Sequence, residues 1–110
     1  MERTPSSAPP TAETWLAEYR TRIEQIRARA EHARARVLMV TATAQTRDGA
    51  VAVTVDASGA LTELRLGVRS EELSRARLAE TVLRLSAEAA ADARARVAAI
   101  MEPLTAEGAP

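Results

Sequence analysis

The apolar residues in the first part of the chain are spaced as in a helix. Between residues 16 and 40 they recur at alternating steps of three and four residues, which is the a and d pattern of a heptad repeat. Thr11 precedes the pattern and can cap the helix, and Glu13 lies in the first turn, where the helix dipole favours an acid. We therefore predict a long first helix that begins after Thr11. Its apolar seam consists of Leu16, Tyr19, Ile23, Ile26, Ala30, Ala33, Val37 and Val40.

After residue 40 the pattern changes to an alternation of small polar and apolar residues. Such alternation in residues 41–44 and 51–55 is typical of β-strands. Asp48-Gly49 and Ser58-Gly59 lie at hairpin positions, where glycine supplies the positive φ of a tight turn. A third strand is expected at about residues 60–66, so the sequence predicts a three-stranded antiparallel meander. In the third strand, Leu64 and Leu66 belong to one face and Glu63 and Arg65 to the other.

A second helical pattern follows the predicted sheet. Ser70 or Ser74 can cap this helix, and Pro103 is expected to end it. The first half carries apolar residues over a wide arc and should be buried on two sides. The second half narrows to coiled-coil spacing. Its seam consists of Ala90, Ala93, Val97, Ile100 and Leu104.

These elements predict one α+β domain over residues 11–104, with the order α-β-β-β-α. Residues 1–10, rich in proline and serine, are expected to form a disordered head, and residues 105–110 a flexible tail. Helices of about 27 residues span about 40 Å, whereas strands of about six residues span about 20 Å. Half of each helix should therefore extend beyond the sheet and pair with another helix, in this chain or in a second copy.

Composition favours a small aliphatic core and assembly into a dimer. Aromatic residues make up 2% of the 110 residues, and neither Phe nor Cys is present. A core of Ala, Val, Leu and Ile buries little area per side chain, so a monomer should be only marginally stable. The aliphatic run of residues 37–40 is far too short to cross a membrane. We expect a cytoplasmic protein.

The sequence contains no recognisable catalytic, cofactor or metal-binding pattern. His32, the single histidine, falls on the outer face of the first helix, with no second imidazole or thiolate to complete a metal site. Ser58 and Ser86 have no local histidine partner, and the glycines fit neither a dinucleotide fingerprint nor a phosphate loop. We therefore expect a protein that is not an enzyme and binds no small-molecule substrate.

Arginines border the apolar seam of the first helix on both sides. With Leu16 as position a, the e and g positions are occupied entirely by Arg, and two parallel copies of this helix would repel each other. Two interpretations stay open: solvated flanks balanced by glutamates one turn away, or two ridges that contact phosphates. These arginines are Arg20, Arg27 and Arg34 at e, and Arg22, Arg29 and Arg36 at g.

Over residues 12–104, the chain resembles the YbaB/EbfC family of nucleoid-associated proteins. The resemblance is carried by the order helix, meander, helix and by four segments: Val40-Thr41-Ala42, residues 48–55, residues 58–66 and the Ala-rich run of residues 85–97. It implies a tweezer-like homodimer whose helices project from a joined β base. It also implies binding to double-stranded DNA with little sequence preference.

The resulting prediction is a DNA-binding homodimer of the nucleoid, with the six arginines as phosphate contacts. The alternative is a dimeric adaptor for another protein, because the chain is similar to divergent actinobacterial relatives, some of them associated with type VII secretion.

Overall fold

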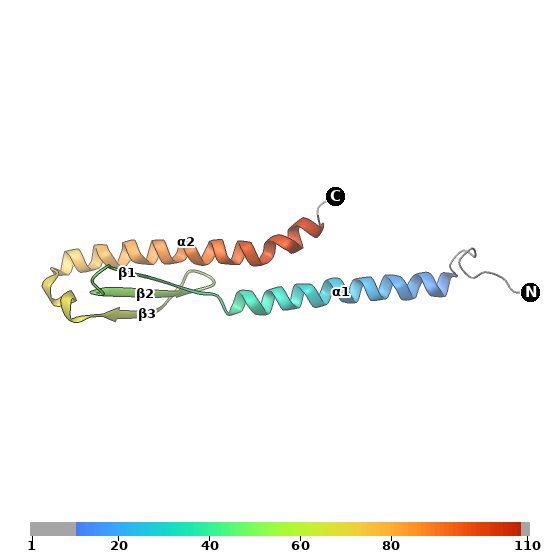
Figure 1. The fold of residues 1–110 in the computed structure, drawn as a ribbon, viewed down its shortest axis with the longest axis horizontal. Helices are drawn as coiled ribbons and strands as arrows, with labels where there is room; N and C mark the ends of the chain where they lie inside the picture. The colour runs from blue at the N-terminus through green and yellow to red at the C-terminus, as the bar shows by residue number, and fades with distance from the viewer. Residues whose placement is uncertain (1–10, 109–110) are drawn as a thin grey trace, which may run out of the picture. The chain divides into compact units, whose positions relative to one another are not determined.

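The computed structural model describes residues 11–108, with side chains described as far as Thr105. The elements are helix α1 (Ala12–Leu38), strands β1 (Thr41–Gln45), β2 (Val51–Asp56) and β3 (Leu61–Leu66), the 3-10 helix η2 (Val68–Glu72) and helix α2 (Arg75–Gly108) (Figure 1). This order confirms the predicted α-β-β-β-α fold. The head predicted for residues 1–10 lies outside the described residues. The chain divides into two compact units, one ending at His32 and one beginning at Ala33.

Helix α1 begins at the predicted cap. The backbone N–H of Thr14 donates to Oγ1 of Thr11 at 3.1 Å, which satisfies one of the free amides of the first turn. Most of the helix is exposed, and Ala33 is its one buried residue. The apolar seam of α1 is therefore largely uncovered in the single chain.

The sheet is the predicted antiparallel meander, with strand order β1-β2-β3. Thr43 lies opposite Thr54, and Val53 opposite Leu64, with an irregularity between Thr54 and Val55. On one face, Oγ1 of Thr43 and Oγ1 of Thr54 are 2.8 Å apart, within hydrogen-bonding distance. On the other face, the valines of β2 point toward α2.

Each hairpin turn contains a glycine, and the carboxylate of a nearby aspartate supports its backbone. Gly49 has φ 75° and Gly59 has φ 87°, as the two turn signals predicted. Oδ1 of Asp56 accepts hydrogen bonds from Oγ of Ser58 at 2.6 Å and from the backbone N–H of Ala60 at 3.1 Å. These hydrogen bonds, that of the Ser58 hydroxyl first, favour the ionised carboxylate and lower the pKa of Asp56.

The core lies between α2 and the first two strands. Val51, Val53 and Val55 are completely buried, and Leu85 and Ala93 of α2 close over them. Small alanines on α2 let the helix approach the valines of β2 closely. The core is thus built from Ala, Val and Leu, as the composition indicated.

The second helix differs from prediction at its end. Ser74 is the cap, because its Oγ accepts the N–H of Arg77 at 3.1 Å, whereas Ser70 lies in η2 and donates to the carbonyl of Gly67. The helix runs through Pro103 to Gly108, so the prediction that Pro103 ends it was wrong. A proline removes one hydrogen bond and bends a helix without always stopping it. Figure 1 shows α2 bending toward its C-terminal end. Residues 105–108 of the expected tail have helical backbone.

The first half of α2 is buried on one side. Leu78 and Val82 pack against the core, but Leu83 is 71% exposed and Ala79 is also exposed. The prediction that this half is buried on two sides was therefore wrong for the single chain, because the side with Ala79 and Leu83 is uncovered.

Candidate nucleic-acid interface

The part of the chain with described side chains holds no buried polar centre. No polar or charged side chain there is buried, and no group of three or more His, Asp or Glu residues is placed to hold a metal ion. His32 is exposed, as predicted. Within residues 11–108, no helix combines the length and the apolar character needed to cross a membrane. Any binding chemistry of these residues must lie on the surface.

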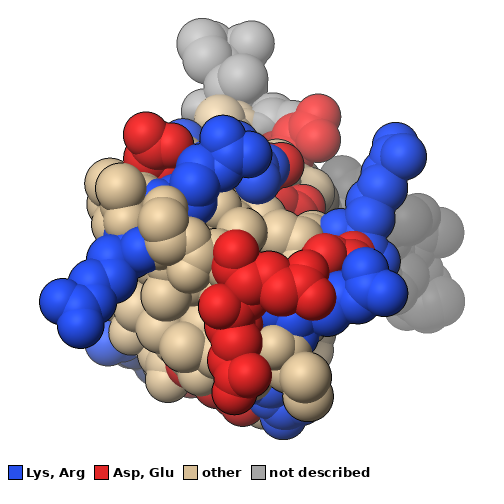
Figure 2. Space-filling model, turned by 90° about the vertical axis from the view of Figure 1, so that its left-hand side faces the viewer, with Lys and Arg blue, Asp and Glu red and all other residues tan. Residues whose placement is uncertain are grey.

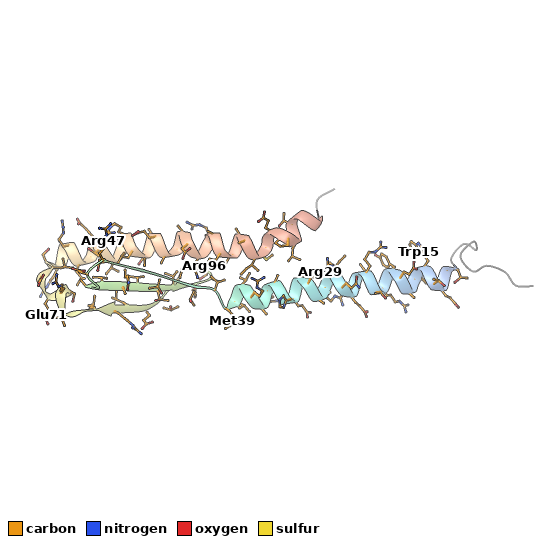
Figure 3. The ribbon with its side chains drawn as sticks, viewed as in Figure 1. Trp15, Arg29, Met39, Arg47, Glu71 and Arg96 are labelled. Carbon is orange, nitrogen blue, oxygen red and sulfur yellow. The ribbon has the colours of Figure 1, made fainter. Side chains whose placement is uncertain are left out.

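All six predicted arginines lie on α1, and all six are exposed. Seven residues separate successive members of each row, which corresponds to about 10 Å along a helix at 1.5 Å per residue. Because e and g positions lie on opposite sides of an a/d seam, the apolar residues run between the two rows. Figure 3 labels Arg29 of the g row about midway along α1.

Most of these arginines are not held by carboxylates. Among the described residues, no ion pair involves Arg20, Arg22, Arg27, Arg34 or Arg36. The pairs expected one turn away, with Glu18, Glu24 and Glu31, are thus not formed. Five guanidinium groups on one helix consequently keep their donors available to a phosphate.

On the other described parts of the chain, three arginines form ion pairs, whereas Arg47, Arg69, Arg75, Arg77 and Arg94 form none and are exposed. Arg65 pairs with Glu63 at 2.7 Å, and Arg84 with Glu88 at 3.4 Å. Arg96, labelled on α2 in Figure 3, pairs with Asp92 at 3.1 Å and donates to the backbone carbonyl of Thr41 at 3.2 Å. Near η2 and the start of α2, acidic and basic side chains are intermingled, as Figure 2 shows.

The predicted helix seam divides into two differently exposed parts. On α1, Leu16 is 46% exposed, Tyr19 50% and Ile26 52%, while Ile23 and Val37 are half-buried. On α2, Ala93 is fully buried in the core. The remaining α2 seam residues are partly buried: Ala90, Val97, Ile100 and Leu104. Val97 and Ile100 pack against the core. Pairing between the helices stays a prediction.

An apolar surface on β3 was not predicted. Leu61, Leu64 and Leu66 lie opposite the three buried valines of β2. They are therefore on the same face of the sheet as these valines, which is the face where α2 covers β1 and β2. All three are nevertheless between 43% and 50% exposed. The order of the meander could have indicated this, because the last strand is an edge strand beyond the reach of one helix.

The structure thus has the α-β-β-β-α element order, with two rows of exposed arginines along α1. The chain belongs to the YbaB/EbfC DNA-binding family, whose model matches residues 15–109. This is a family of nucleoid-associated DNA-binding proteins that are not known as enzymes. Among curated proteins, none matches the chain.

Proposed function

We propose that this protein binds double-stranded DNA through its phosphate backbone, with little sequence specificity, and that the six arginines of α1 make the contacts. The observation that carries the proposal is the presence of five exposed arginines on this helix that form no ion pair. Arg suits this role because its planar guanidinium donates two parallel hydrogen bonds to a phosphate. Such contacts position a protein on DNA without reading the bases.

We also propose that the DNA-binding form is a homodimer joined through the sheet. The exposed leucines of β3 lie at the edge of the core and would extend it across two copies. Two rigid copies would double the number of arginine rows that one duplex can meet. In this proposal the protein is a non-enzymatic component of the nucleoid in the cytoplasm.

The test is a titration of DNA binding against salt. If three to six phosphates are neutralised per protomer, log affinity should fall with log salt at a slope of about −3 to −5 per protomer, at about −0.9 per phosphate. Arg27→Ala should weaken binding equally on unrelated duplexes and reduce the slope by about one for each protomer engaged.

Arg77→Ala is the matched control, because Arg77 is also exposed but lies on α2. It should leave the slope unchanged. Absence of binding to any duplex at about 20 mM salt, where phosphate contacts are strongest, would refute the proposal.

A further inference from the structure

The N-terminal half of α1 carries an apolar strip that contains both aromatic residues of the described chain. The strip consists of Trp15, Leu16, Tyr19, Ile23 and Ile26. Trp15 is 58% exposed, and its ring stacks on that of Tyr19 with centroids 6.0 Å apart and planes 4° apart. Figure 3 places Trp15 near the start of α1. Exposed aromatic rings beside arginines have the composition of a protein-binding hot spot, where Trp, Tyr and Arg are enriched.

The charges around this strip exclude an identical helix as its partner. Arg20 and Arg27 border it on one side and Arg22 on the other. A parallel copy would place e against g, and an antiparallel copy would place e against e and g against g. Arg meets Arg in both cases, so self-pairing is repelled.

The second helix of another copy is also a poor occupant. Its core-facing side, with Leu85, Ala89 and Ala93, is already buried against its own sheet. The seam of its second half is bordered by Arg94 and Arg96, which would again place Arg against Arg. The strip is therefore complementary to a partner helix whose apolar side is exposed and whose flanking side chains are acidic.

We propose that the strip binds an acidic amphipathic helix of another protein. Leucine-type side chains of the partner would cover Tyr19 and Ile26, and its Glu or Asp side chains would pair with Arg20, Arg22 and Arg27, which form no ion pair within the described chain. Helix-in-groove recognition of this kind uses apolar anchors one turn apart. The inference does not rest on DNA binding, although both partners would use the same arginines.

Trp15 is the single tryptophan of the chain, so its fluorescence reports directly on whether a partner covers the strip. The probe is a designed helical peptide with Leu at a and d and Glu at e and g, and the control peptide has Lys at e and g. The Glu peptide should shift Trp15 emission to shorter wavelength, with an affinity that falls as salt rises. The Lys peptide should bind at least tenfold more weakly.

Variants then assign the contacts. Tyr19→Ala keeps the tryptophan and should lower the affinity for the Glu peptide roughly tenfold, because it removes one aromatic anchor. The double variant Arg20→Glu and Arg27→Glu should reverse the preference toward the Lys peptide. Leu83→Ala, an exposed apolar residue on α2, is the control and should change neither affinity.

Three outcomes would overturn the proposal. Equal affinity for the two peptides would show that charge does not select the partner. Failure of both peptides to move Trp15 emission would show that the strip is not a helix site. A tryptophan emission that shifts to longer wavelength on dilution of the protein alone would show that a second copy already covers the strip. DNA binding is measured separately, so its failure would not affect these results.

Discussion

Gly67 is the position where a single methyl group should damage this fold most specifically. Its backbone has φ −80° and ψ 176°, which any residue can adopt. A Cβ built there, however, would lie 2.5 Å from the carbonyl oxygen of Gly49, which belongs to the backbone of the β1–β2 turn. Gly67 also donates its N–H to the carbonyl of Ala50 at 2.8 Å. The end of β3 is thus held against this turn with no room for a side chain.

The expected cost of Gly67→Ala follows from these contacts. Separating the two backbone segments should cost about 1–3 kcal/mol, as in other overpacked sites, and weakening the hydrogen bond of Gly67 about 1 kcal/mol. The smaller conformational freedom of Ala in the unfolded chain offsets about 0.4–1 kcal/mol. The net loss is about 1–3.5 kcal/mol. Because about 1 kcal/mol moves the Tm of a domain of this size by about 4–8 °C, the Tm should fall by roughly 4–28 °C.

Gly49→Ala is the matched comparison across the same contact. Gly49 has a positive φ of 75°, but a Cβ there would have nothing within 4 Å. The left-handed conformation costs Ala about 1–2 kcal/mol, partly offset by the same unfolded-state effect. Thermal unfolding at one fixed protein concentration should therefore rank wild type first, Gly49→Ala second and Gly67→Ala last. A Gly67→Ala variant as stable as Gly49→Ala would refute the close approach.

Three other predictions test the core, a turn and the dimer. Leu85→Ala should cost about 2–5 kcal/mol in unfolding free energy, because Leu85 is 1% exposed, whereas Leu83→Ala should change it by about 0.5 kcal/mol or less; equal losses would contradict the packing. Because the pKa of Asp56 is lowered in the folded state, its contribution to stability is present above its ordinary pKa of about 4 and is lost as pH falls through the folded-state pKa. Asp56→Asn should therefore make the unfolding midpoint depend less on pH in the acid range. An unchanged pH dependence would exclude this carboxylate as a contributor. Leu64→Glu should give a folded monomer in sedimentation, with Leu83→Glu still dimeric, and a dimeric Leu64→Glu would exclude the β3 surface.

Local signals predicted most of the fold. The heptad spacing and the Thr11 cap located α1, and the turn pairs at Asp48-Gly49 and Ser58-Gly59 located both hairpins with the correct sign of φ. These features succeed because a cap or a positive φ depends on a few neighbouring residues. Whether a helix continues past Pro103 depends on what bending costs over a whole turn, which the spacing does not contain.

The candidate site was less predictable than the fold. The sequence located the arginines of α1, since periodicity alone defines e and g positions. It did not show that Arg27 would leave Glu31 unpaired while Arg96 pairs with Asp92 at the same i,i+4 range. The orientation of long exposed side chains depends on their surroundings as much as on spacing, and the extra hydrogen bond of Arg96 to Thr41 helps to fix that pair. The exposure of the β3 leucines likewise depends on how far α2 reaches across the sheet.

The arrangement of charge also bears on how assembly and DNA binding are connected. Because the arginine rows repel a second copy of α1, a dimer must use another surface, and the leucines of β3 are apolar, exposed and free of charge repulsion. Assembly through β3 would leave both copies of α1 available for phosphates, so the salt slope of the dimer should approach about −6 to −10, twice the value for one protomer. Leu64→Glu and Arg27→Ala should then act differently: the first should halve the slope without altering the contacts of each protomer, and the second should reduce it by about one for each protomer engaged. If Leu64→Glu yields monomers that keep the full slope of the wild type, DNA binding does not use both copies.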